Sequence, residues 1–184
     1  MSTATDLLTE RLVEALYRIE GKAEIVNGHI EIMSPTGDLP STAAFAIASS
    51  LRDYARAHGG RAYGDNAGFL VDLPNRKSFC PDAAYYTGPR AGMKFLPQAP
   101  DFAVEVRSEG DYGPSAEREM EKKRGEYFAA GAAVVWDVDL DSQDVVRVYR
   151  ASSPDTPTIY RRGEVAEAEP AVPGWTMPVN ELFE

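Results

Sequence analysis

The sequence predicts a single mixed α/β (α+β) domain over residues 1–184, because two kinds of apolar pattern alternate along the chain. Apolar residues recur at helical spacing in the segments 5–17, 41–58 and 115–130. Between and after these segments lie short alternating or wholly apolar runs, which are typical of β-strands. A chain of 184 residues fits one or at most two domains, and we find no internal repeat, low-complexity tract or linker that would divide it.

The first half begins with the helical segment 5–17 and continues into "AEIVNGHIEIM". Its Asn27-Gly28 pair lies between alternating apolar residues and predicts a β-hairpin with a two-residue turn. In that register the facing pairs are Val26 with His29, Ile25 with Ile30, and Glu24 with Glu31. "SPTGDLP" indicates a loop, and "HGG" ends the alanine-rich helix at 41–58.

The second half adds strands and one more helix. Strands are predicted near 61–65, 68–73, 81–86 and 101–107. The segment 88–100 contains several prolines and glycines and is predicted to be a long exposed loop, whereas the helix at 115–130 ends at Gly131. "AAVVWDVDL" predicts a buried strand that pairs with "DVVRVYR" across "DSQ", and short strands with a proline-rich tail close the chain.

Composition limits the chemistry open to the chain. The formal net charge of −10 argues against broad, non-specific attraction to nucleic acid, but it leaves room for a local basic cleft or a bound divalent ion. One cysteine (Cys80) and two histidines (His29 and His58) are too few for a Cys/His zinc site. Any bound metal would therefore have oxygen ligands, which suits Mg²⁺, Ca²⁺ or Mn²⁺. Cys80 itself is interpreted as a small buried hydrophobe rather than a nucleophile.

The sequence also carries signals for the cellular compartment of the protein. It contains no run of eighteen apolar residues, so we expect no membrane span. The N-terminal stretch "MSTATDLLTERLVEALYR" carries acids among its apolar residues, unlike a signal peptide. The single cysteine cannot form an internal disulfide and favours a reducing compartment. We therefore expect a cytoplasmic protein.

The stretch "DFAVEVRSEGD" predicts a strand that carries charged residues within an apolar run typical of a protein core. Its period of two puts Phe102, Val104 and Val106 on one face, and Glu105 with Arg107 on the other. A buried carboxylate is costly unless it is paired or binds metal. Two interpretations stay open: a Glu105–Arg107 ion pair at a sheet edge, or a functional carboxylate in a cleft.

Two further carboxylates lie at strands. In "FCPDAAYY", Pro81 suits the start of a strand, and Asp82 belongs either to a simple entry turn or to a site. In the hairpin, Glu24 faces Glu31, although like charges directly opposite each other are destabilising. Either both carboxylates lie on a solvated face, or Glu24 borders a site that holds a cation.

The helix at 115–130 supplies a lysine. Its apolar stripe is formed by Ala116, Met120, Tyr127 and Ala130, one face at about 100° per residue. Lys123 interrupts this stripe, whereas Lys122 and Arg124 are predicted to point away. Lys123 either extends along the surface to water or reaches the polar face of the Glu105 strand, which directly precedes this helix.

Together these residues suit phosphodiester hydrolysis. Two carboxylates can hold Mg²⁺ or Mn²⁺, which polarises a phosphate and lowers the pKa of an attacking water. A lysine can orient that water or stabilise the charge that develops on phosphorus. Other hydrolytic chemistry has less support, because the sequence contains neither a GxSxG elbow nor a P-loop.

The chain resembles the Uma2 family of restriction endonucleases, within the PD-(D/E)xK nuclease superfamily. The matching stretches occur in family order and cover nearly the whole chain: "EIVNGHIEIMSP", "CPDAAYY", "PDFAVEVRS", "EKKRGEYFAAGAAVVWDVD" and "VPGWTMPVNELF". This resemblance implies a restriction-endonuclease-like fold, with a central mixed β-sheet flanked by helices. It also implies an Mg²⁺-dependent endonuclease that acts on DNA.

The resemblance implies roles for particular residues. Asp82 and Glu105 match the metal-binding carboxylates, and the carbonyl of Val106 would be a backbone ligand. The superfamily's E-x-K lysine position is occupied by Arg107, and Lys123 matches the position of a lysine that has moved to the following helix. Glu24 matches an early acidic position that completes the metal site or orients a helix.

Two departures from the family pattern support an alternative. Many members carry a histidine after the "SP" loop, and "GDLPSTAAF" has none; Arg107 stands where the lysine is usual. The alternative is a catalytically impaired binding or regulatory protein that keeps the nuclease fold. If DNA is the partner, the candidate phosphate contacts are Arg76, Lys77, Arg90 and Lys94. Because cutting both strands takes two sites, we expect a homodimer or higher homo-oligomer.

Overall fold

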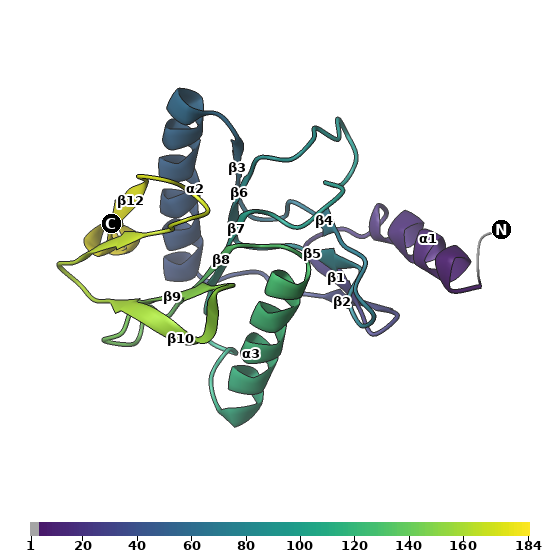
Figure 1. Cartoon of the computed structure of the whole chain (residues 1–184). Coiled ribbons are helices and arrows are strands. Elements are labelled where there is room, and N and C mark those ends of the chain that lie inside the picture. Colours follow the sequence, from purple (N-terminus) through teal and green to yellow (C-terminus); the bar gives the residue numbers. More distant parts are fainter. Residues whose placement is uncertain (1–3) are drawn as a thin grey trace.

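A six-stranded mixed sheet forms the centre of the computed structural model, which describes residues 4–184 (Figure 1). Its strand order is β10-β9-β8-β7-β6-β3. Only the β7–β8 pair is parallel among the neighbouring strands of this sheet, and the others are antiparallel. The strands are β3 (Arg61–Tyr63), β6 (Ala83–Tyr86), β7 (Phe102–Val106), β8 (Val134–Val138), β9 (Val146–Arg150) and β10 (Ser153–Tyr160).

Helices α2 (Asp38–His58) and α3 (Pro114–Ala129) contribute to the cores on opposite faces of this sheet. On one face, Phe102 and Val104 of β7 belong to the same core as Ile47 of α2. On the other face, Ala103 belongs to a second core with Tyr127 of α3. The alternation along β7 is therefore as predicted from its period of two. Since both faces are covered, every residue of β7 is buried, including Glu105.

The N-terminal part lies to one side of the central sheet (Figure 1). Helix α1 (Ala4–Leu16) is followed by the hairpin β1 (Ala23–Val26) and β2 (His29–Ile32). The predicted hairpin register is confirmed at every pair. Asn27 and Gly28 have φ angles of 49° and 76°, the left-handed values that a type I′ turn requires.

Short elements complete the fold. β4 (Phe69–Leu70) pairs with β5 (Ser78–Phe79), and β11 (Val165–Glu167) pairs with β12 (Thr176–Pro178). The 3₁₀ helix η1 (Val179–Phe183) packs against α2, and its buried Val179 and Leu182 join the α2 core. Within residues 4–184, no helix has the length and apolar character needed to cross a membrane.

The structure confirms the mixed α+β class and corrects some boundaries. Helix α2 begins at Asp38, so part of "SPTGDLP" is helical; Pro40 is tolerated there because the first-turn N–H groups have no intrahelical partner. β4 occupies only two residues of the predicted strand 68–73, and the two-residue β5 was not predicted. Elements this short carry too little periodicity to be recognised from sequence.

Candidate active site

Asp82 and Glu105 face each other across neighbouring strands. Ala83 of β6 pairs with Val104 of β7, and continuing that antiparallel register places Asp82 opposite Glu105. The Asp82 N–H donates to the Val104 carbonyl at 3.0 Å, and the Val106 N–H donates to Asp82 Oδ2 at 2.7 Å. Asp82 is 8% exposed and Glu105 is 7% exposed. Two opposed, buried carboxylates are unfavourable without cations between or beside them.

Lys123 reaches Glu105 from helix α3, which is one of the two interpretations that its place in the apolar stripe left open. Its Nζ lies 2.9 Å from Glu105 Oε1 and 3.0 Å from Glu24 Oε1. One turn later, the buried Tyr127 hydroxyl donates a hydrogen bond to the same Glu105 Oε1 at 2.6 Å. Stacking of the Tyr127 ring on Phe79, with ring centroids 3.9 Å apart, seats this helix against the core. Glu105 is thus held from α3 by one cation and one hydroxyl.

Glu24 lies on the inner side of its strand rather than on a solvated face. It is 4% exposed, and its Oε1 also accepts the Cys80 N–H at 2.8 Å. Arg76 donates to Glu24 Oε2 and also pairs with Glu126 of α3. Of the two roles implied for Glu24, this geometry favours orienting helix α3, because the contacts join β1 to that helix.

Arg76 corrects one sequence-based expectation. As a loop residue it was a candidate phosphate contact, yet it is only 6% exposed and is committed to Glu24 and Glu126. The reason is that its loop folds onto β1, where the Lys77 N–H donates to the Ile25 carbonyl at 2.9 Å. Lys77 pairs with Asp72. Arg90 and Lys94 are both exposed on the 88–100 loop.

Lys22 is a site residue that sequence reasoning missed. Its Nζ donates to Asp82 Oδ1 and lies 2.9 Å from Asp65 Oδ1, with the side chain 13% exposed. Lys22 lies just before the predicted hairpin, outside the alternating pattern that indicates its strands. The signal was its spacing: it lies two residues before Glu24, and side chains two apart along an extended segment point to the same side.

The charges of the cluster shift its ionisation. Burial raises the pKa of Glu105; Lys123 opposes this and Asp82 reinforces it, so the pKa lies above its ordinary value. For Glu24, burial is overcome by Lys123 and Arg76, and the pKa lies below its ordinary value. Burial would lower the pKa of Lys123, but Glu105 and Glu24 raise it above its ordinary value. Lys123 is therefore an ammonium donor at neutral pH.

Arg107 does not pair with Glu105, which corrects that interpretation of the strand. Its Nε lies 2.7 Å from Asp137 Oδ1, and its Nη2 lies 2.8 Å from Asp137 Oδ2. The same guanidinium also pairs with Glu117 of α3. Asp137 lies on the neighbouring strand β8 and offers the two-oxygen geometry that a guanidinium fork prefers, so it outcompetes Glu105.

Arg124 was predicted to point away from the sheet, and that prediction is wrong. Its guanidinium carbon lies 3.8 Å from the centroid of the Tyr149 ring, and its Nη1 lies 3.9 Å from Asp137 Oδ2. A guanidinium on a flexible stem can turn toward an aromatic face from the edge of an apolar stripe. Lys122, by contrast, is exposed as predicted.

Comparison with known proteins identifies the family. Residues 12–180 match the profile of the Uma2 family, described as "Putative restriction endonuclease". The chain belongs to the Uma2 family. The fold is similar to a crystal structure titled as a "putative nuclease belonging to DUF820 from Anabaena variabilis ATCC 29413", with a TM-score of 0.72 and 16% sequence identity. That similarity covers 94% of this chain and 97% of the other, and it confirms the predicted nuclease-like fold. No curated protein matches the chain.

The donor set of this Uma2 family member suits one hard cation. Within the described part of the chain, no group of three or more His, Cys, Asp and Glu side chains is arranged to hold a metal ion. Asp82 and Glu105 nevertheless place two buried carboxylates opposite each other. Two carboxylates are enough for Mg²⁺, which keeps several of its waters and usually binds one or two protein carboxylates together with substrate phosphate.

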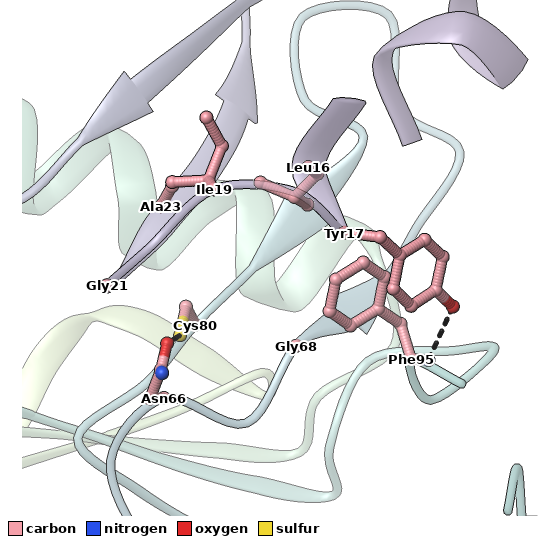
Figure 2. A pocket seen from close by; sticks show the side chains of 9 residues that line it. All are labelled: Leu16, Tyr17, Ile19, Gly21, Ala23, Asn66, Gly68, Cys80 and Phe95. Atoms are coloured by element: carbon pink, nitrogen blue, oxygen red, sulfur yellow. Dashed lines mark hydrogen bonds between the residues drawn. The ribbon is translucent and has the colours of Figure 1, made fainter. Parts of the chain in front are cut away.

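Asp82 lines one small cavity, and a second cavity is lined by Cys80, whose N–H donates to Glu24. One, of about 150 Å³, is lined by Asp82, Asp65 and Phe45 among others, and Phe45 is 75% exposed at its rim. Figure 2 shows the other, of about 140 Å³, with Cys80 and Asn66 side by side at one end and the stacked Tyr17 and Phe95 rings at the other. Burial raises the pKa of Cys80 to about 12, which agrees with its interpretation as an unreactive buried thiol.

Proposed function

We propose that this Uma2 family member is a divalent-metal-dependent endonuclease that hydrolyses DNA phosphodiester bonds. The observation that carries the proposal is the convergence of Asp82, Glu105 and Lys123, which come from the residue before β6, from β7 and from α3. Membership of a family described as "Putative restriction endonuclease" supports the reaction class. The fold alone would not, since one fold hosts many functions and the site must carry the argument.

The proposed ligands of Mg²⁺ or Mn²⁺ are the carboxylates of Asp82 and Glu105 with the carbonyl of Val106. When bound there, the ion supplies Lewis-acid polarisation of a phosphate and a more acidic water. The chain's contribution is to hold the two carboxylates opposite each other. The residues on either side of Glu105 hold Asp82 in place through their backbone groups. The Val104 carbonyl accepts the Asp82 N–H, and the Val106 N–H donates to Asp82 Oδ2.

Lys123 acts as a hydrogen-bond donor and a fixed positive charge in this proposal. Because its pKa lies above the ordinary value, it does not serve as a general base at neutral pH. It can donate to a phosphate oxygen or to the attacking water, and a preorganised donor of this kind accelerates phosphoryl chemistry. Glu24, fixed in turn by Arg76, holds the ammonium beside Glu105.

DNA would meet a chain of formal net charge −10, so the proposed contacts are local. Arg90 and Lys94, exposed on the 88–100 loop, are the main candidates for phosphate binding, and the third candidate, Lys77, is paired with Asp72. We also propose a homodimer, because a cut through both strands of a duplex takes two sites. Sedimentation of the purified protein, alone and with a DNA duplex, tests that assembly.

Cleavage of plasmid DNA tests the function. The protein should nick or cut DNA with Mg²⁺ or Mn²⁺ and not in the presence of a chelator. Asp82→Asn keeps the size of the side chain and should remove activity, whereas Asp72→Asn, at an exposed loop carboxylate, should not. Equal cleavage by wild type and the Asp82 variant would refute the assignment of the site.

A non-catalytic binding protein is the second candidate. The observation that favours it is that Arg107, at the usual lysine position, is committed to Asp137 and Glu117. This candidate predicts no divalent-cation affinity that depends on Asp82 and Glu105. Calorimetric titration of Mn²⁺ into wild type and Glu105→Gln separates the two: a signal that disappears in the variant supports the metal site.

A further inference from the structure

Lys22 occupies one oxygen of a carboxylate that the proposed function assigns to metal. Its ammonium donates to Asp82 Oδ1, while Asp82 Oδ2 accepts the Val106 N–H. Glu105 has its own cation, Lys123. Each of the two facing carboxylates is therefore paired with a separate lysine, and this pairing reduces the penalty of burying two opposed negative charges.

A divalent cation bound between Asp82 and Glu105 would repel the Lys22 ammonium from its present position. An ammonium in contact with Asp82 Oδ1 would lie next to a double positive charge, and like charges at such distances repel strongly when partly buried. Lys22 has a long flexible stem, so its ammonium can move without moving the backbone. The structure supplies one place for it to go, since Asp65 Oδ1 already lies 2.9 Å from its Nζ.

Asp65 is more exposed than Asp82 and can keep the ammonium after it leaves Asp82. Its side chain is 50% exposed, in contrast to 11% for the Asp82 side chain. Asp65 and Asp82 both line the cavity of about 150 Å³ beside α2. The remaining lining residues carry no charge: Thr36, Ser41, Ala44, Phe45, Ala48 and Gly64.

We propose that Lys22 is a built-in counter-ion of Asp82 which a divalent cation displaces on binding, and that Asp65 then holds the displaced ammonium. The inference rests on the metal site proposed above. It explains how the two facing carboxylates stay paired without metal, and it makes Lys22 a positioning residue that tunes metal affinity. Lys22 thereby sets a threshold concentration of cation below which the site stays closed by its own lysine.

Calorimetric titration with Mn²⁺ tests the displacement. Lys22→Met keeps the length of the stem and removes the charge. It should bind Mn²⁺ about tenfold more tightly than wild type, because a charged hydrogen bond no longer has to be broken. The matched control is Lys77→Met, which removes an ammonium from the exposed pair with Asp72 and should leave the affinity unchanged. Without metal, Lys22→Met should also melt at a lower temperature than wild type, and Mn²⁺ should raise its Tm by more.

A double-mutant cycle separates displacement from simple charge attraction. Asp65→Asn in the wild-type background should weaken Mn²⁺ binding, because the displaced ammonium loses its acceptor. In the Lys22→Met background the same change should have little effect, since there is no ammonium to receive. If Asp65 acted only through its charge on the ion, the two effects would be equal, and equal effects would overturn the inference.

The Mn²⁺ titrations distinguish failure of the role proposed for Lys22 from failure of the metal site. Equal Mn²⁺ affinity of wild type and Lys22→Met, with binding lost in Glu105→Gln, would overturn the role of Lys22 and leave the metal site standing. Absence of binding in wild type and in Lys22→Met would overturn both. A wild-type crystal structure with bound Mn²⁺ gives a check free of variants: Lys22 Nζ should remain beside Asp65 and lie beyond hydrogen-bond distance of Asp82. Retention of the Lys22–Asp82 contact in that structure would overturn the inference.

Discussion

Lys123 Nζ on helix α3 lies 2.9 Å from Glu105 Oε1 on strand β7. This contact joins a helix and a strand that follow one another in the chain, and it places a permanent donor beside a carboxylate of the proposed metal site. The exposed neighbour Lys122 shows that helical phase, and not local charge, selects which lysine reaches the sheet.

Replacing Lys123 should therefore abolish most of the proposed activity. Lys123→Met removes the donor while keeping the stem, and we expect DNA cleavage to fall by roughly 100-fold or more, as for other preorganised donors. Lys122→Met provides the matched control one residue away and should cleave like wild type. Cleavage is measured on plasmid DNA under single-turnover conditions; equal rates for both variants would contradict the role of Lys123.

Glu24→Gln should separate the two roles implied for Glu24. The amide can still accept the Cys80 N–H but no longer neutralises Lys123 and Arg76. If Glu24 only positions Lys123, Mn²⁺ affinity measured by calorimetry should stay close to wild type while cleavage slows. A loss of Mn²⁺ affinity as large as that of Glu105→Gln would instead identify Glu24 as a metal ligand.

The Arg107–Asp137 pair should contribute to stability through burial. Arg107→Leu leaves the 1%-exposed Asp137 without its two-point partner, and removing one member of a buried pair typically costs about 3–5 kcal/mol. Urea unfolding measures this free energy. The double variant Arg107→Leu with Asp137→Leu should recover much of the loss, because Asp137 no longer stays buried without Arg107.

A surface pair calibrates that experiment. Arg56 and Asp53 form an exposed ion pair on α2, with side chains 66% and 78% exposed. Arg56→Leu should change the free energy of unfolding by less than about 1 kcal/mol. A loss for Arg107→Leu no larger than for Arg56→Leu would contradict the clamp that Arg107 forms between β7, β8 and α3.

The exposed cations of the 88–100 loop should govern DNA affinity rather than catalysis. Arg90→Ala together with Lys94→Ala should weaken binding on all sequences alike and flatten the dependence of log Kd on log salt concentration by roughly two in slope. Lys77→Ala, whose ammonium is paired with Asp72, should leave the slope unchanged. Fluorescence anisotropy titrations at several salt concentrations, without divalent metal, measure this slope for wild type, the double variant and Lys77→Ala. Equal slopes for the three proteins would refute the contact.

Much of the fold was predictable because its signals are local. The Asn27-Gly28 turn determined the hairpin register, and period-two alternation placed Glu105 opposite the apolar face of β7. Helical phase placed Lys123 in the apolar stripe of α3 and left two alternatives, one of which was the contact with Glu105. These residues show their roles through spacing along one element, which the sequence displays directly.

The errors concern partners that lie far apart in the chain. Arg107 finds Asp137 thirty residues later, and Arg76 finds Glu24 fifty-two residues earlier. Which carboxylate a buried guanidinium selects depends on strand order and on the folding of a loop onto β1, and neither is encoded in local periodicity. Lys22 was missed for a similar reason, because Asp82 lies sixty residues away.

Anomalous diffraction from crystals grown with Mn²⁺ shows whether Asp82 and Glu105 bind one ion together. We predict one strong peak within about 2.1–2.2 Å of carboxylate oxygens from both Asp82 and Glu105, with Lys123 Nζ still beside Glu105. A peak elsewhere in the molecule, or none at these carboxylates at a Mn²⁺ concentration that supports DNA cleavage, would contradict it.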